Sequence, residues 1–161
     1  MTAFPKTKFP FVIVLDNIRS ALNVGAIFRT CDGAGVAKLY LCGITPYPPH
    51  NRIPKTALGA SEYVEWERFP NTMELLQKLK DEGYTLVTVE QTPNAKPYYE
   101  VDYPEKTALV FGHEITGVND EAVNLSDIQV EVPMFGQKNS LNVATTAGIL
   151  SYHLAVTYFK S

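Results

Sequence analysis

Apolar residues along this chain fall into short continuous runs that alternate with longer segments of helical spacing. The continuous runs are rich in β-branched and aromatic residues, which is typical of strands buried on both faces of a sheet. These runs occupy residues 11–15, 37–42, 84–90, 107–111 and 128–132. One further run, at residues 63–69, alternates between apolar and polar positions and predicts a half-exposed strand.

Three segments between or after these strands have the pattern of helices. The first covers residues 21–31 and is ended by Gly33-Ala34-Gly35. The second begins at a cap formed by Asn71 with a reciprocal Glu74 and stops at Gly83. The third reaches the end of the chain. Because strands and helices alternate, we predict an α/β fold with a mostly parallel sheet and helices on both faces. The length fits a single domain over residues 1–161.

The last predicted helix has almost no polar side. Small residues and large apolar residues share it: Leu141, Val143, Ala144, Thr145, Ala147, Gly148, Ile149, Leu150, Ser151, Leu154, Ala155, Val156 and Phe159. A helix that is apolar all round is expected to be buried all round. Two explanations fit: one face covers the sheet while a second copy of the chain packs on another, or the helix is simply part of the core.

The segment before this helix has the composition of a ligand-binding turn. It leads from a strand end at Val132 through a proline and a glycine into a polar helix start. In parallel α/β sheets, ligands bind where strand ends meet the free N–H groups of helix starts. Gly112 and Gly136 predict two close backbone turns in this region, and Glu114 is expected at the rim of the same crevice.

Charge narrows the classes of function. The net charge of −3 argues against a chain that coats nucleic acid indiscriminately, but residues 1–60 hold seven Lys or Arg against two acids. A basic surface for RNA and an uneven solvated surface explain this asymmetry about equally well. The segment 43–59 contains Arg52 and Lys55 and is expected to be a long irregular loop, for which an RNA contact and plain solvation are both open.

Several kinds of site are not indicated. Cys31 and Cys42 lack metal-ligand spacing and are expected to be reduced and buried, and the histidines are not spaced as ligands, so no metal is predicted. The chain has no long apolar run and no signal-peptide core, so we expect no membrane partner and a cytoplasmic location. The common phosphate-binding and hydrolase motifs are also missing.

Three blocks of sequence carry a resemblance to a known family. They are Asn23-x-Gly25-x-x-x-Arg29, then Phe111-Gly112-x-Glu114-x-x-Gly117, then Val132-Pro133-Met134 through Ser140-Leu141-Asn142-Val143. In this order they resemble the TrmH (SpoU) family of S-adenosylmethionine-dependent RNA ribose 2′-O-methyltransferases, within the SPOUT superfamily. The resemblance implies a SPOUT-type fold with a C-terminal trefoil knot, and a homodimer.

The resemblance also implies a site for S-adenosylmethionine in the crevice formed by the loops after three strands. The residues expected to surround the cofactor, largely through backbone groups, are Val89, Glu90, Gly112, Val132, Met134, Ser140 and Leu141. An uncharged purine needs apolar walls and a few main-chain hydrogen bonds, which these residues can offer. Such a site requires no phosphate-binding loop.

The positions that match the family's functional polar residues are Asn23, Arg29, Glu114, Ser140 and Asn142. In the family, the arginine matching Arg29 is proposed to assist the ribose 2′-hydroxyl, which must be aligned with the methyl group and lose a proton. A guanidinium keeps its proton to a pKa above about 12, so Arg29 has two candidate roles: base, or clamp for the neighbouring phosphate. Asn23, Glu114 and Asn142 are expected to orient Arg29 and the ribose, and Ser140 to cap the last helix.

The implied substrate is an RNA. Transfer RNA is the first choice, since small single-domain relatives commonly act on it, and ribosomal RNA is the second. The residues expected to contact RNA are Arg19, Arg29, Arg52 and Lys55. A non-catalytic protein that binds the cofactor or RNA is a competing class, which the intact polar residues argue against. A nucleotide-binding oxidoreductase would need a glycine fingerprint that this chain lacks.

Overall fold

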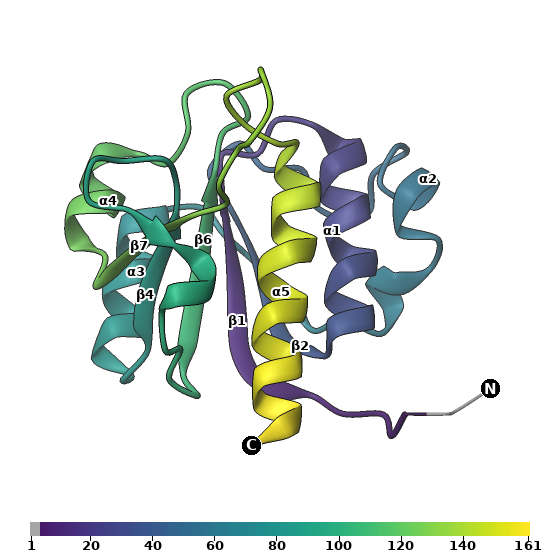
Figure 1. Cartoon of the computed structure of the whole chain (residues 1–161). Coiled ribbons are helices and arrows are strands. Elements are labelled where there is room, and N and C mark those ends of the chain that lie inside the picture. The colour runs from purple at the N-terminus through teal and green to yellow at the C-terminus, as the bar shows by residue number, and fades with distance from the viewer. Residues whose placement is uncertain (1–3) are drawn as a thin grey trace.

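A computed structural model describes residues 4–161, which form a seven-stranded sheet (Figure 1). The strands are β1 (Phe9–Asp16), β2 (Val36–Cys42), β3 (Trp66–Phe69), β4 (Thr85–Val89), β5 (Lys96–Pro97), β6 (Thr107–Gly112) and β7 (Ile128–Glu131). Their order across the sheet is β3-β2-β1-β6-β4-β7-β5, and every neighbouring pair is parallel. The predicted parallel α/β sheet is confirmed.

Helices cover both faces of this sheet (Figure 1). On one face α1 (Ala21–Ala34) packs against α5 (Val143–Lys160), with the short α2 (Pro54–Ala57) beside α1; α3 (Thr72–Asp81) and α4 (Asp120–Leu125) cover the other. Each face has its own apolar core. Phe11, Phe28 and Leu150 belong to the first, and Leu75 and Val110 to the second.

The ends of two helices follow the expected chemistry. Asn71 caps α3 by accepting a hydrogen bond from the Glu74 N–H at 3.1 Å, as predicted. Ser20 caps α1 in the same way, through the Asn23 N–H at 3.2 Å. The α1 helix ends within Gly33-Ala34-Gly35, as predicted, at Gly35, whose φ of 67° places it in the left-handed region.

The segment 43–65 follows its prediction in part. Residues 43–53 form an irregular loop, as expected, but α2 and a 3₁₀ turn at Ala60–Glu62 follow it, and β3 begins only at Trp66. Pro54 at the start of α2 pre-sets the helical φ. Gly25 lets α2 approach α1 closely, because a Cβ at this position would collide with Thr56 and with the Ile53 carbonyl. The sequence also gave no signal for α4 and β5, which span only six and two residues.

The last helix buries one side within the chain. Its buried residues are Ala147, Leu150, Ser151, Leu154 and Ala155. Tyr152, Val156 and Phe159 lie on other sides and remain about half exposed, at 49%, 49% and 51%. The expected burial all round is therefore not met by one chain alone.

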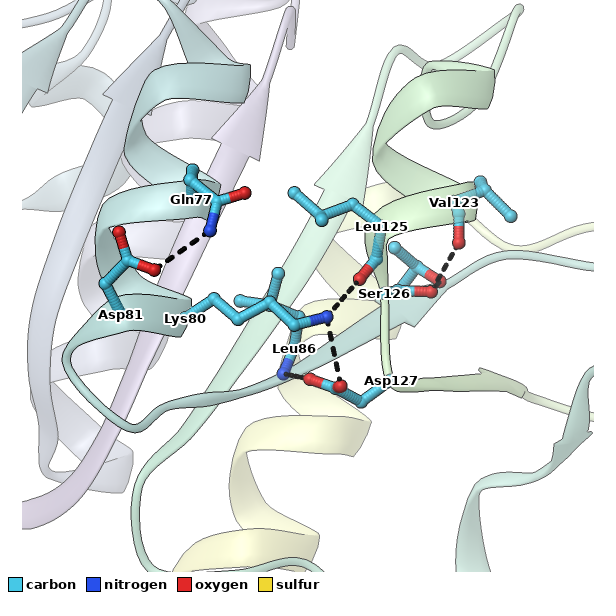
Figure 2. A network of polar contacts seen from close by, with 9 residues as sticks. Gln77, Lys80, Asp81, Leu86, Val123, Leu125, Ser126 and Asp127 are labelled. Atoms are coloured by element: carbon cyan, nitrogen blue, oxygen red, sulfur yellow. Dashed lines mark hydrogen bonds and ion pairs between the residues drawn. The ribbon is translucent and has the colours of Figure 1, made fainter.

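Polar contacts hold α4 and the start of β7 against α3 and β4 (Figure 2). The Lys80 ammonium on α3 donates to the Leu125 carbonyl at 2.9 Å and pairs with the Asp127 carboxylate at 3.2 Å. The other oxygen of Asp127 accepts the Leu86 N–H at 2.8 Å. A helix of six residues is not stable by itself, so these contacts to neighbouring elements fix its position.

Burial makes both cysteines unreactive at neutral pH. Cys31 and Cys42 are buried free thiols, as expected. Burial raises the pKa of Cys31 strongly and that of Cys42 to about 12, so neither thiolate is populated at neutral pH. Within residues 4–161 there is no helix long and apolar enough to cross a membrane, and no group of three or more potential metal ligands.

Gly25→Ala tests the close approach of α2 to α1. The added methyl group must displace backbone, so we expect a loss of about 1–3 kcal/mol in the free energy of unfolding, measured by urea denaturation. The matched control is Gly148→Ala in α5, where a Cβ meets no atom within 4 Å. That variant should be unchanged or more stable by up to about 1 kcal/mol. Equal stabilities of the two variants would contradict this account of Gly25.

Candidate active site

A cavity of about 260 Å³ opens at the carboxyl ends of β4, β6 and β7, beside the first turn of α5. Six of the seven residues expected around a cofactor line it: Val89, Glu90, Gly112, Val132, Ser140 and Leu141. Glu114 and Asn142 line it as well. Met134 is not among its lining residues. The fold thus places most of the candidate residues around one cavity.

Sequence reasoning missed further residues of the cavity wall: Gln91, His113, Thr116, Glu131, Val143 and Thr146. Most adjoin residues that were predicted, so their position next to a strand end or a motif was the available signal. Gln91 also ties two loops together, since its amide donates to the Asn139 carbonyl at 2.6 Å. Thr146 lies in the first turn of α5, three positions after Val143, so the two residues share the side of the helix that faces the cavity.

The wall after β6 is a tight turn made by residues 113–117. His113 and Gly117 exchange backbone hydrogen bonds of 3.1 and 2.8 Å, and the Glu90 carboxylate accepts the Val118 N–H at 2.7 Å. This folds the turn back onto Gly112, where a Cβ would collide with the backbone of Gly117 and Val118. The predicted close backbone turn at Gly112 is confirmed. The one predicted at Gly136 is wrong, because a Cβ there would meet nothing within 4 Å.

A hydrogen-bond network joins this turn to the starts of α1 and α5. The Glu114 carboxylate accepts the backbone N–H groups of Arg19 and Ser20, at 2.9 and 3.0 Å, and the Asn23 amide at 3.0 Å. The Asn23 carbonyl oxygen in turn accepts the Asn142 amide at 3.1 Å. Three polar residues that are distant in the sequence therefore form one connected group.

The network keeps Glu114 ionised. Burial alone would raise the pKa of its carboxyl group, but the hydrogen bonds from Arg19, Ser20, its own N–H and Asn23 outweigh that effect and lower the pKa below its usual value. A carboxylate that accepts several N–H groups is stabilised in its charged form. Glu114 is therefore an anchor for backbone rather than a proton donor at neutral pH.

The cap of α5 is Asn142, not Ser140. The Asn142 carbonyl oxygen accepts the N–H groups of Ala144 and Thr145, at 2.8 and 3.3 Å. The helix begins at Val143, so Ser140 stands two residues before the capping position. Ser140 instead lies on the cavity wall.

Arg29 lies apart from the network. It is exposed on α1 and lines a different hollow of about 660 Å³, together with Lys55 and Tyr152. Asn23 and Arg29 are six positions apart on one helix, which directs them to different sides. Arg19 and Arg52 are also exposed, and neither lines the cavity. Arg19 adjoins the cavity through its N–H bond to Glu114, whereas Arg29 and Lys55 line a separate hollow.

The charge of the cavity wall restricts its ligand. The wall carries the carboxylates of Glu90, Glu114 and Glu131, and no Lys or Arg belongs to it. Such a wall disfavours phosphate groups and favours a neutral or cationic molecule. A parallel α/β sheet with this cavity at its strand ends defines the class: a protein that binds a small molecule beside a helix start, as α/β enzymes do.

Sequence comparison identifies the family. A sequence model of the SpoU rRNA methylase family matches residues 10–152, and the chain belongs to that family. The tRNA (guanosine(18)-2′-O)-methyltransferase of Thermus thermophilus is 33% identical over 140 residues, which cover 87% of this chain and 71% of that protein. The enzyme of the same name from Aquifex aeolicus is 32% identical over 151 residues, covering 91% and 69%.

Solved structures agree with this assignment. The TrmH/SpoU tRNA modifying enzyme of A. aeolicus superposes with a TM-score of 0.87 at 30% identity, covering 96% of this chain and 78% of that one. An S-adenosylmethionine-bound rRNA methyltransferase from Sinorhizobium meliloti has a TM-score of 0.87 at 24% identity, covering 98% and 60%, and shares the fold. The family resemblance found in the sequence is confirmed.

Glu114→Gln tests the anchoring role of the carboxylate. Glutamine offers one neutral acceptor, so we expect a loss of about 1 kcal/mol at neutral pH, a value reduced because the side chain is partly solvated. A lowered pKa stabilises the fold above the usual carboxyl range, and this contribution disappears as the pH falls through the lowered value. Urea denaturation should therefore show the largest difference from wild type near pH 7 and none at the acid end.

The control is Glu62→Gln, at an exposed residue whose side chain makes no hydrogen bond or ion pair with residues 4–161. Its stability should follow that of the wild type at every pH. A Glu114→Gln difference that does not change with pH would contradict the ionised anchor.

Proposed function

We propose that this protein transfers a methyl group from S-adenosylmethionine to a ribose 2′-hydroxyl of a transfer RNA. The observation that carries the proposal is the acid-lined cavity framed by the Glu114, Asn23 and Asn142 network, in a chain of the SpoU family. Relatives at 32–33% identity are named as tRNA 2′-O-methyltransferases, which favours tRNA over ribosomal RNA.

The lining residues of the cavity suit S-adenosylmethionine in polarity and charge. Val89, Val132 and Leu141 provide apolar walls for a purine. The carboxylates of Glu90 and Glu131 suit the sulfonium and ammonium charges, while an adenine dinucleotide would bring phosphates to a wall without cations. When bound, the cofactor supplies a methyl group on a positively charged sulfur, ready for attack by a hydroxyl oxygen.

The residues of the chain help to align the ribose hydroxyl with the methyl group of the cofactor. Gly112 allows the backbone turn at 113–117 to close one side of the cavity, and Glu114 fixes that turn to the start of α1. The Asn23 side-chain oxygen accepts a hydrogen bond from the Asn142 amide, which connects this group to the start of α5. The transfer forms one O–C bond, breaks the S–C bond of the cofactor and releases the hydroxyl proton to the neighbouring phosphate or to solvent. Holding the hydroxyl and the methyl group in line is therefore a large part of what such an enzyme must do.

A homodimer would bring Arg29 into the active site. Within one chain Arg29 lies in a separate hollow with Lys55 and Tyr152, while the apolar Val156 and Phe159 of α5 remain about half exposed. Packing of α1 and α5 on a second copy would cover these residues and place Arg29 at the partner's cavity. There the guanidinium clamps the phosphate beside the target ribose and polarises its 2′-hydroxyl, which is easier for arginine than acting as a base.

We also propose that the C-terminal segment forms a trefoil knot, and the strand order supports this. Strand β7 lies between β4 and β5, although residues 90–95 join those two strands directly. Both β4 and β5 pair with β7 at Val130, so this connection crosses β7 near its end. After β7, the chain continues through residues 132–142 into α5.

Methyl transfer to RNA is the direct test. Labelled S-adenosylmethionine is incubated with the protein and, separately, unmodified tRNA and ribosomal RNA, and the products are digested to nucleosides. Label in a 2′-O-methylnucleoside of tRNA is the expected result, and mapping would identify the position. Label in ribosomal RNA alone would replace tRNA as the substrate, and cofactor binding without transfer to either pool would favour the non-catalytic alternative.

Mixing two inactive variants tests the placement of Arg29. Arg29→Ala should bind S-adenosylmethionine normally but transfer no methyl group, and Gly112→Val should block the cavity. If Arg29 serves the partner's cavity, random subunit exchange restores one working site in the mixed dimer, about a quarter of wild-type activity. If Arg29 serves its own chain, the mixture stays inactive. Gly136→Val is the control for Gly112→Val, since its added side chain meets open space.

A further inference from the structure

Two segments of chain border the mouth of the cavity at the ends of β4, β6 and β7. The turn at 113–117 and residues 132–142 both supply lining residues, and they lie next to each other at the top of Figure 1. The two most exposed large apolar side chains among the described residues lie on these segments: Phe135 at 95% and Ile115 at 83%. Scattered exposed apolar residues are ordinary, but two at the mouth of one cavity indicate a surface that a ligand covers.

The segment that carries Phe135 makes few contacts with the rest of the chain. Among the described residues, one hydrogen bond joins residues 133–141 to another segment, from the Gln91 amide to the Asn139 carbonyl at 2.6 Å. Phe135 lies four positions before this tie, and its side chain packs on almost nothing. No interaction within the chain therefore explains the ring, and its faces are open to a flat molecule.

The charge of this segment indicates what that molecule is. Lys138 is the only charged residue between positions 133 and 142. It is exposed, and it forms no ion pair with any carboxylate of residues 4–161. An open aromatic ring beside a free cation is the combination that binds unpaired nucleic acid, because the ring stacks on a base while the cation attracts the phosphate backbone.

The geometry of the reaction brings a base to the same place. The cofactor occupies the cavity, so the target 2′-hydroxyl has to reach its mouth. The base is bonded to C1′, the carbon next to C2′, and so it stays close to the reacting oxygen. Across the mouth, the His113 ring is already engaged, since its Nδ1 accepts the N–H groups of Ile115 and Thr116 at 3.0 and 3.2 Å. Phe135, in contrast, presents a free ring, and unstacked bases of RNA are commonly bound by such rings.

We infer that Phe135 stacks on the base of the target nucleotide while the ribose of that nucleotide lies at the mouth of the cavity. This inference rests on the proposed function. The Lys138 ammonium lies near the RNA backbone, and Ile115 offers an apolar contact from the opposite border. Every base has a π face, so the stack holds the nucleotide in place without reading its identity. Phe135 is thus a substrate-binding residue that does not touch the cofactor.

Substitutions of Phe135 test the stack through the kinetics of methyl transfer. Phe135→Ala should lower kcat/KM for the RNA about five- to 100-fold, the usual effect of losing one stacked ring. Its affinity for S-adenosylmethionine, measured by calorimetry, should match wild type because Phe135 does not line the cavity. Phe135→Tyr keeps the ring and should stay within about twofold of wild type. Phe135→Leu keeps apolar bulk without a ring and should resemble Phe135→Ala.

The matched control is Tyr99→Ala, at another exposed aromatic residue, 54% exposed, that does not line the cavity. Its kcat/KM should equal that of wild type. Phe135→Trp adds a direct readout, since stacking on a base quenches tryptophan fluorescence. The substrate RNA should quench Phe135→Trp more than wild type. The same RNA without the base of the target nucleotide, but with its ribose and 2′-hydroxyl, should lose this extra quenching.

Four results would overturn the inference. They are a loss in Phe135→Ala no larger than in Tyr99→Ala, full activity of Phe135→Leu, equal quenching by the two RNAs, and weaker self-association of Phe135→Ala in sedimentation. The last result would make the ring a contact between two copies of the chain. In each case wild type still methylates RNA, so the proposed function would stand without the stacking site. Failure of the proposed function itself would appear separately, as absence of methyl transfer by wild type.

Discussion

The hydrogen bonds of the Glu114 carboxylate hold the upper part of this molecule together. They connect the turn after β6 to the backbone before α1, and through Asn23 they reach the cap of α5. They add to the β1–β6 pairing, which already brings Asp16 beside Gly112. Because a charged acceptor bonded to several N–H groups is stronger than a neutral one, a single ionised side chain sets the shape of the cavity rim.

This arrangement also explains why the cavity has two unlike sides. Gly112 and the turn at 113–117 form a wall of hydrogen-bonded backbone, whereas residues 135–141 are exposed, Phe135 to 95%. The fixed wall suits a recognised ligand, and the exposed segment suits a large partner that arrives from solvent. A small cofactor and an RNA make these two different demands on one site.

Much of the fold could be predicted from the sequence because strong local signals agreed with the tertiary structure. The apolar runs at 11–15 and 107–111 became the central strands β1 and β6, and the Asn71 cap formed as expected. Prediction failed for α4, β5 and α2, because these elements are short and depend on contacts with other parts of the chain. The site shows the same division. Motif residues marked the cavity, but only the fold revealed that Asn142 rather than Ser140 caps α5 and that Arg29 faces elsewhere.

The pairing of the central strands has a consequence for the way the chain is made. Val12 in β1 pairs with Ala108 in β6, so one edge of β1 has no partner until residues 107–112 have emerged from the ribosome. Contacts between such distant segments are slow to form, and an apolar strand with an open edge invites association with other chains. During synthesis, β1 therefore keeps one open edge until about two thirds of the chain has been made.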